Sequence, residues 1–233
     1  MCTVSFISRK GLELITANRD EDPRRAAALL QTYRSLSGDD YWIAREPVHG
    51  GSNLAISKRA EITVLLNGAW EAHERGSHYR KSRGLVVLDS LEQNSLEDFC
   101  ESYDFEGIEP FTMLRLAKIM EELRWDGSRT FYKTKAPGKP AIWASAQLYE
   151  PEVRAAREVW FEHLLSSSPS PEDVLDFHKH GGIGDPWNDM CMNRFGLVRT
   201  VSITQLCRRE GSATWEHLDL VGGNSRKHKW EWG

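Results

Sequence analysis

The chain has 233 residues, of which 40% are hydrophobic, enough for a substantial core in one large domain or two small ones. Its formal net charge of -4 at pH 7 lacks the basic excess that nucleic-acid-binding proteins usually carry. No stretch approaches the roughly 20 apolar residues of a membrane-spanning helix, and no secretory leader opens the sequence. We therefore expect a single domain over residues 1–233, located in the cytoplasm, without a nucleic-acid partner or a membrane span.

Four cysteines are scattered along the chain without any Cys-x-x-Cys pair. This spacing indicates neither a zinc site nor a disulfide framework, so we expect no metal and no cofactor. The cysteines are Cys2, Cys100, Cys191 and Cys207. Nine tryptophans are many for this length. They either fill a core between two sheets or line an apolar pocket for an acyl, sterol-like or porphyrin ligand.

The first 21 residues join Cys2 to the polar tetrad Asn18-Arg19-Asp20-Glu21. Two β-like runs, at 3–8 and 12–17, meet at Lys10-Gly11 and predict a hairpin that returns the tetrad toward the chain start. Removal of Met1, common before a small residue, leaves Cys2 with a thiol and an α-amine of pKa about 8. The amine can then accept the thiol proton, so that one residue supplies nucleophile and base. A Met-Cys start alone is more typical of a small apolar residue that begins an edge strand.

The middle of the chain predicts short strands and one interrupted helix. Tight spacing favours an antiparallel meander that extends the sheet of the first hairpin, with strands at 41–45, 52–57 and 61–66. A helix begins after Ser82 and continues to residue 103 with a break near 94–95. A second sheet is expected from strands at 111–116, 119–125, 129–133 and 141–145, although the spacing within 114–123 also fits a helix.

The last third predicts two helices and a hairpin. Helices are expected at 150–166 and 172–180, the second capped by Ser170. A strand from Phe195 to Thr204 pairs with a strand at 213–220, and the tail at 224–233 packs on the surface. The basic run His178-Lys179-His180 is typical of a helix end before a glycine, with His178 as the alternative haem ligand.

Asn67 ends an expected strand directly before Gly68. An asparagine amide at a strand end is a suitable donor to a developing oxyanion, and glycine allows the backbone to turn closely. An ordinary Asn-Gly turn explains the same pair. Both interpretations stay open on local sequence.

The start Met1-Cys2-Thr3-Val4-Ser5-Phe6 and the tetrad at 18–21 together resemble the NRDE family, which is named for the tetrad and includes the eukaryotic transport-and-Golgi-organisation proteins. Segments at 65–69, 79–84, 142–145 and 200–204 are similar to its bacterial branch. The resemblance implies an α+β fold, a four-layer αββα N-terminal-nucleophile hydrolase-like sandwich of two antiparallel sheets. It is the fold of the bile-salt hydrolase and penicillin V acylase group, whose mature chains start with cysteine and cleave non-peptide C–N amide bonds.

The resemblance also implies roles for individual residues. Cys2 would be the nucleophile, and Asn67 with backbone amides would hold the oxyanion. Arg199, or Arg194 as the second choice, matches a late-strand arginine that approaches the nucleophile, and a nearby guanidinium lowers the pKa of a thiol.

Further roles fall on the tetrad and on the expected strand end near residue 145. Arg19 and Asp20 would hold the thiolate and the ammonium in place. Asn18 and Glu21 would brace this pair and bind substrate. Ser145 stands where the wider group has a second asparagine, and we expect it to contact substrate with a shorter reach.

The preferred function is therefore hydrolysis of a carbon–nitrogen bond in a linear, small-molecule amide. An alternative is a non-catalytic carrier that binds or traffics haem or a hydrophobic ligand in the same cleft. An inactive scaffold of hydrolase descent is a third reading. Fold resemblance does not choose among them, because one fold hosts many functions.

Overall fold

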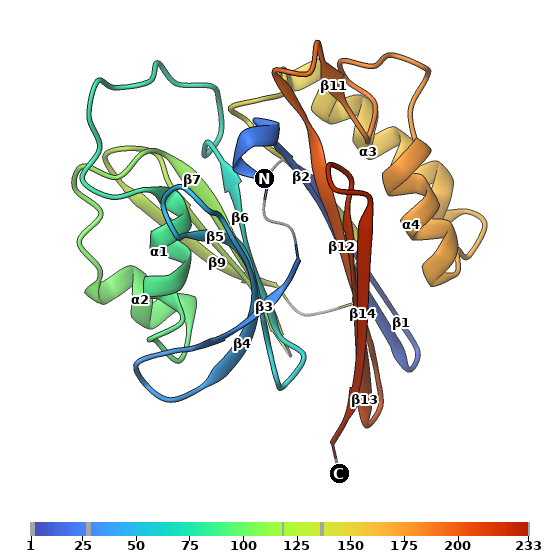
Figure 1. Cartoon of the computed structure of the whole chain (residues 1–233), viewed down its shortest axis with the longest axis horizontal. Coiled ribbons are helices and arrows are strands. Elements are labelled where there is room, and N and C mark those ends of the chain that lie inside the picture. Colours follow the sequence, from blue (N-terminus) through green and yellow to red (C-terminus); the bar gives the residue numbers. More distant parts are fainter. Residues whose placement is uncertain (1–2, 27–28, 118, 136–137, 233) are drawn as a thin grey trace. The chain divides into compact units, whose positions relative to one another are not determined.

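A computed structural model describes residues 3–26, 29–117, 119–135 and 138–232. Internal contacts divide the chain into two compact units whose segments alternate along the sequence. The described residues of unit 1 fall within 1–29, 138–144 and 149–233, and those of unit 2 fall within 30–137 and 145–148. Each unit is built on one antiparallel sheet (Figure 1).

The sheet of unit 1 has the strand order β10-β1-β2-β12-β13-β14, with the short β11 paired to β12. Its strands are β1 (Thr3–Arg9), β2 (Leu12–Glu21), β10 (Ala141–Ala144), β11 (Asn193–Arg194), β12 (Val198–Arg209), β13 (Ser212–Asp219) and β14 (Asn224–Glu231). The helical segments are the 3-10 turn η1 (Pro23–Arg25) and the helices α3 (Pro151–Leu165) and α4 (Pro171–His180).

The expected first hairpin is confirmed. β1 and β2 pair from Thr3↔Asn18 to Arg9↔Leu12, and the turn between them uses Gly11 at φ +73°. Glycine adopts this left-handed conformation without steric cost. The register therefore brings the beginning of β1 to the end of β2 that carries the tetrad.

Helices α3 and α4 cover one face of this sheet (Figure 1). Apolar residues of the hairpin pack there against the helices in a buried cluster of Ile7, Leu12, Leu14, Phe161 and Val174. The expected cap of α4 is confirmed as a capping box between Ser170 and Asp173. Such a cap typically contributes about 1 kcal/mol to stability.

The sheet of unit 2 runs in simple order from β3 to β9. Its strands are β3 (Gln31–Arg34), β4 (Asp40–Arg45), β5 (Ser52–Ser57), β6 (Ile62–Asn67), β7 (Phe111–Leu116), β8 (Met120–Trp125) and β9 (Thr130–Lys135). The helices α1 (Arg83–Ser90) and α2 (Leu96–Ser102) pack on it through buried residues that include Val87, Phe99 and Phe111. Within the ranges that the structure describes, no helix is long and apolar enough to cross a membrane.

The expected division of strands between the two sheets was wrong. Strands β4 to β6 pair onward to β7, with Ile62 opposite Leu116, instead of extending the first hairpin. Strand β10 leaves the expected second sheet and pairs with β1, with Trp143 opposite Val4. The β6–β7 pairing spans α1 and α2, so no local turn signal announces it.

The structure also decides three local expectations. The strands expected at 111–116 and 119–125 are confirmed as β7 and β8, so the helical alternative within 114–123 does not hold for the described residues. The strand expected from Phe195 begins only at Val198, because Phe195 and Gly196 form a turn. The tail expected to pack on the surface forms the mostly exposed edge strand β14.

Candidate functional site

The tetrad at the end of β2 divides between the two faces of its sheet. Successive residues of a strand point to opposite faces. Asn18 and Asp20 bond to partners on the side of α3 and α4, whereas Arg19 and Glu21 belong to the opposite face. Arg19 and Asp20, which we expected to hold the thiolate and the ammonium, therefore lie on opposite faces of the strand.

Asn18 is fully buried, and its amide is occupied within the chain. Its Nδ2 donates to the carbonyls of His178 (3.0 Å) and Met190 (2.6 Å). Its Oδ1 lies 2.7 Å from His178 Nδ1. These contacts are those of a bracing residue, which is one of the two roles expected for Asn18. Both amide hydrogens bond within the chain, so none is left for a substrate.

His178 is a core residue of α4 with both ring nitrogens engaged. Because Asn18 uses its amide hydrogens on two carbonyls, its oxygen must accept, so we assign the ring proton to His178 Nδ1. His178 Nε2 then accepts from the Ser5 hydroxyl at 2.7 Å. Burial, assisted by the charge of Arg157, lowers the pKa of His178 to about 3. A neutral, fully bonded histidine offers no nitrogen to haem iron, so its interpretation as a ligand was wrong.

Asp20 anchors a second buried network on the same face. Its Oδ1 accepts from the Thr200 hydroxyl (2.5 Å) and its Oδ2 from the Tyr149 hydroxyl (2.6 Å). The guanidinium of Arg157 stacks 3.8 Å from the Tyr149 ring and donates to the Thr3 hydroxyl and to main-chain carbonyls, including that of Asp189 at 2.7 Å. The network therefore holds Thr3, the first described residue of β1, from the face covered by α3 and α4.

Sequence analysis missed Arg157 and Tyr149. Arg157 lies on the buried face of α3, fully enclosed, and no carboxylate lies within ion-pair distance among the described residues. Burying a cation is costly unless hydrogen bonds compensate it. A basic residue on the apolar face of the predicted helix at 150–166 was the one available signal.

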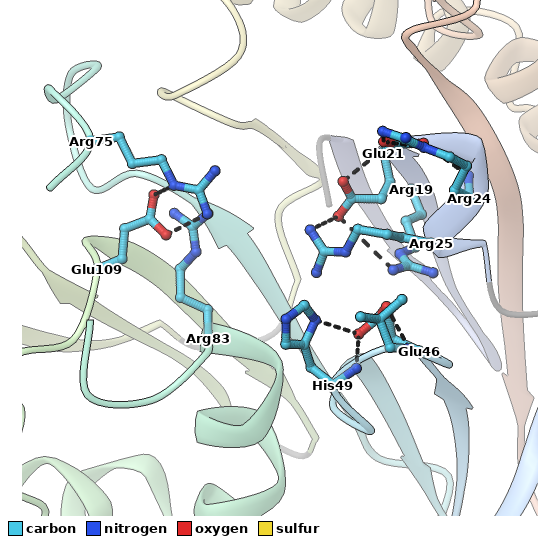
Figure 2. A network of polar contacts seen from close by, with 11 residues as sticks. Arg19, Glu21, Arg24, Arg25, Glu46, His49, Arg75, Arg83 and Glu109 are labelled. Carbon is cyan, nitrogen blue, oxygen red and sulfur yellow. Dashed lines mark hydrogen bonds and ion pairs between the residues drawn. The ribbon is translucent and has the colours of Figure 1, made fainter. Parts of the chain in front are cut away.

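Arg19, Glu21 and Arg25 form a chain of charges on the opposite side of β2 (Figure 2). Glu21 Oε2 lies 3.3 Å from Arg25 Nη1 and 4.0 Å from Arg19 Nη2. Arg199 faces Glu21 directly across the β2–β12 register, so its side chain belongs to the same face. The structure thus brings together Arg19, Glu21 and Arg199.

The two late arginines have different partners. Arg199 Nη2 donates to the Leu220 carbonyl at 3.0 Å. Arg194 donates to the Trp187 carbonyl at 3.2 Å and lies 5.6 Å from the ring of Tyr149. Arg194 therefore belongs to the loop before β12, and only Arg199 has a register partner within the tetrad.

Asn67 and Ser145, both in unit 2, lie in contact. The Ser145 hydroxyl donates to the Asn67 carbonyl at 2.7 Å, and Gln147 N donates to it at 3.2 Å. Ser145 is fully buried, so its proton supports Asn67 instead of reaching outward. No hydrogen bond joins the Asn67 side-chain amide to any other described residue, which leaves it available as a donor.

Gly68 fixes the close turn after Asn67. Its φ is +82°, and an added Cβ would lie 2.8 Å from Gln147 N. Only glycine suits both the conformation and the contact. The turn therefore depends on the glycine that the sequence indicated.

Unit 2 also contains a buried carboxylate, that of Glu109, with basic side chains around it (Figure 2). Glu109 Oε2 is 3.2 Å from Arg83 Nη2, and Glu109 Oε1 is 3.4 Å from His73 Nε2 and 4.0 Å from Arg75 Nε. Pro110, the next residue, accepts from Gly68 N. No sequence signal indicated this cluster, because its basic members lie up to 36 positions before Glu109, in loops and at a helix start.

Two of the other thiols differ from a reactive cysteine. Burial raises the pKa of the Cys191 and Cys207 thiols. Cys2 itself lies outside the described residues. Among the described residues, no group of three or more His, Cys, Asp or Glu side chains could hold a metal ion.

Several solved structures are similar to this chain in fold. An arginine-to-leucine variant of conjugated bile acid hydrolase from Clostridium perfringens matches with a TM-score of 0.51 and 10% identity, covering 100% of this chain and 97% of that chain. Penicillin V acylase from Agrobacterium tumefaciens gives 0.50 and 8%, covering 97% and 84%. The Caenorhabditis elegans ortholog of N-acylethanolamine-hydrolyzing acid amidase gives 0.59 and 10%, covering 88% and 92%. The expected fold class, α+β with two antiparallel sheets and similar in fold to the N-terminal-nucleophile hydrolases, is thereby confirmed.

A family model described as Transport and Golgi organisation 2 (TANGO2) matches residues 1–166. The match covers most of the sequence, and the chain belongs to this family. No curated protein sequence matches the chain.

Proposed function

We propose that this TANGO2-family chain is an N-terminal cysteine amidohydrolase acting on a linear amide of a small molecule. Removal of Met1 would free the α-amine of Cys2, which accepts the thiol proton. The thiolate attacks the amide carbonyl carbon, the C–N bond breaks, and the proton passes to the leaving nitrogen. Water then cleaves the thioester, which releases the acid and restores the thiol.

The register of the first hairpin is the observation that supports this proposal best. Thr3, the residue after Cys2 in the sequence, pairs with Asn18, so the described beginning of β1 adjoins the tetrad. The Arg157 side chain bonds the Thr3 hydroxyl from the helix face. A nucleophile attached to a strand anchored in this way begins with less conformational freedom to lose.

Arg19 and Arg199 are the proposed cations near the nucleophile. They share the face opposite the buried network, and a guanidinium beside sulfur favours the thiolate. We propose that Glu21 keeps these cations apart and contacts substrate. Asp20 would act indirectly, since Tyr149 and Thr200 already occupy its carboxylate.

Asn67 is proposed as the oxyanion donor. Its carbonyl is fixed by Ser145 and Gln147 while its side-chain amide makes no bond to other described residues. A fixed donor is effective because it needs no reorganisation when charge develops. Ser145 would then influence substrate through Asn67.

The proposed substrate class is supported by solved structures of similar fold, whose names refer to conjugated bile acids, penicillin V and N-acylethanolamines. We propose an amide with an apolar acyl group for this chain. The haem-carrier alternative gains no support, since His178 is buried and bonded on both nitrogens.

A panel of N-acyl amides, assayed by release of the free amine, tests the proposal. The wild-type chain should hydrolyse at least one member, Cys2→Ala should abolish turnover, and Asn67→Ala should lower kcat by about 100-fold or more. Asn94→Ala, a change at an exposed position of unit 2, serves as the matched control. Turnover that survives Cys2→Ala would refute the mechanism.

A further inference from the structure

The turn between β11 and β12 holds a phenylalanine in a conformation that favours asparagine or glycine. Leu197 N donates to the Arg194 carbonyl at 3.0 Å, so Phe195 and Gly196 are the central residues of a tight turn. Both have positive φ, 54° and 72°. Type I′ turns with this pattern prefer Asn-Gly, and a bulky residue there is strained. The demands of the turn therefore do not explain Phe195.

The side chains around this turn are apolar and exposed. Phe195 is 80% exposed, Leu197 74% and Ile183 79%, and Trp187 is 44% exposed. The rings of Trp187 and Phe195 meet edge to face at 5.1 Å. We call the two segments that carry these four residues, the β11–β12 turn and the loop after α4, the apolar loops. Exposed apolar side chains gathered in this way mark interaction surfaces.

Hydrogen bonds hold the apolar loops in place. The Asp189 carboxylate accepts from Ile183 N and Gly184 N, both at 2.9 Å. The Asp185 carboxylate accepts from Trp187 N at 2.9 Å. The loop therefore presents Ile183 and Trp187 in a fixed arrangement.

Basic residues lie on the elements next to the apolar loops. The carboxylates of Asp185 and Asp189 both accept from loop N–H groups. Arg194 lies on β11 directly before the turn, and Lys179 lies in the last turn of α4. Apolar side chains in front of arginine and lysine suit an interface between hydrocarbon and anionic headgroups.

We propose that the apolar loops dock the protein on a membrane surface that contains anionic lipid. Tryptophan and phenylalanine favour the membrane interface, and nearby cations add attraction to anionic lipid. A protruding turn enters a fluid interface without needing a complementary groove. Strand β12 continues from this turn to Thr200, which bonds Asp20, so docking would bring this end of the unit 1 sheet to the lipid.

Vesicle flotation of the full chain tests the proposal without any need for catalysis. Wild type should float with phosphatidylcholine vesicles that contain phosphatidylglycerol, and much less with phosphatidylcholine alone. Phe195→Asn should lower the bound fraction about tenfold. Its melting temperature should stay equal or rise, because asparagine suits the turn. Leu36→Ser, which changes a 94% exposed leucine in unit 2, should bind as wild type does.

Other occupants of the same surface predict different results. A second copy of the chain would give a dimer in sedimentation without lipid, and Phe195→Asn would convert it to monomer. That result, with no flotation of wild type, would overturn the membrane proposal. Equal flotation of wild type and Phe195→Asn would overturn it as well.

Discussion

The two faces of β2 at its tetrad end differ in how their polar groups are satisfied. On the helix face, Asn18 and Asp20 are buried and bonded to His178, Met190, Thr200 and Tyr149. On the opposite face, Glu21 bridges Arg19 and Arg25 at 4.0 and 3.3 Å, and Arg199 stands beside it. On the helix face, short hydrogen bonds that satisfy both side chains indicate a structural role. On the opposite face, the longer ion pairs leave the arginines able to exchange partners.

A continuous polar run in a sequence need not form one functional group. Strand alternation separates the tetrad into two pairs with different neighbours. Changes on the helix face should therefore alter stability, and changes on the opposite face should alter activity. Each of the following experiments tests that division.

The largest stability effect is expected at Arg157. Arg157→Ala would leave buried carbonyls of Asn188 and Asp189 and the Thr3 hydroxyl without their donor. We expect a loss of about 3–5 kcal/mol in the free energy of unfolding, measured by urea denaturation. Glu158→Ala, on the exposed side of the same helix, should change it by less than about 0.5 kcal/mol. Similar losses for both variants would contradict the network.

Asn18 and Arg19 give the most direct contrast between the faces. Asn18→Ala removes the partners of His178 and Met190 and should cost about 2–4 kcal/mol of stability. Arg19→Lys keeps the charge but loses the guanidinium geometry. It should lower kcat/KM about 100-fold with a stability change under about 1 kcal/mol. The control is Arg24→Lys at an exposed arginine. Equal effects of the first two variants on stability would remove the distinction.

The pH dependence of stability should report the buried histidine. Burial and the charge of Arg157 lower the pKa of His178 to about 3 in the folded chain, from the ordinary value of 6.5. Between those values the unfolded chain binds the additional proton, so stability falls as pH falls from about 6.5 toward 3, by about 1.4 kcal/mol per unit.

His217 contributes in the same direction, since burial lowers its pKa to about 4. His178→Gln should therefore reduce the slope without abolishing it, as measured by denaturation at several pH values. A variant slope equal to that of wild type would show that His178 is protonated in the folded chain.

The smallest effect is expected at Ser145. Ser145→Ala removes one hydrogen bond to the Asn67 carbonyl and should cost about 1 kcal/mol. A matching, modest fall in kcat is expected, because Gln147 N still holds the carbonyl. A fall as large as that of Asn67→Ala would mean that the Ser145 hydroxyl itself meets substrate.

Local pattern predicted the parts of the fold that local interactions determine. The first hairpin follows from alternation and the Lys10-Gly11 turn, and α4 from its Ser170 cap. Pairing of β6 with β7 and of β10 with β1 depends on contacts between distant segments, which no turn residue records. The strand predicted from Phe195 failed because its backbone adopts a turn unusual for phenylalanine.

The candidate site shows the same limit. Chemistry-bearing residues such as Asn67 and Arg199 stand out by type and by position at strand ends. Their partners do not, since Ser145 contacts Asn67 across 78 positions and Arg157 contacts Thr3 across 154. Those distant partners decide whether a polar side chain has a structural role or remains available for chemistry.

The most direct test of the central claim is the intact mass of the purified protein, before and after brief treatment with iodoacetamide at neutral pH, beside Cys2→Ala. The account predicts loss of Met1 and fast, stoichiometric labelling at Cys2, ahead of Cys191 and Cys207, whose thiol pKa values are raised by burial. Retained Met1 together with slow labelling of Cys2 would contradict an N-terminal cysteine nucleophile in this chain.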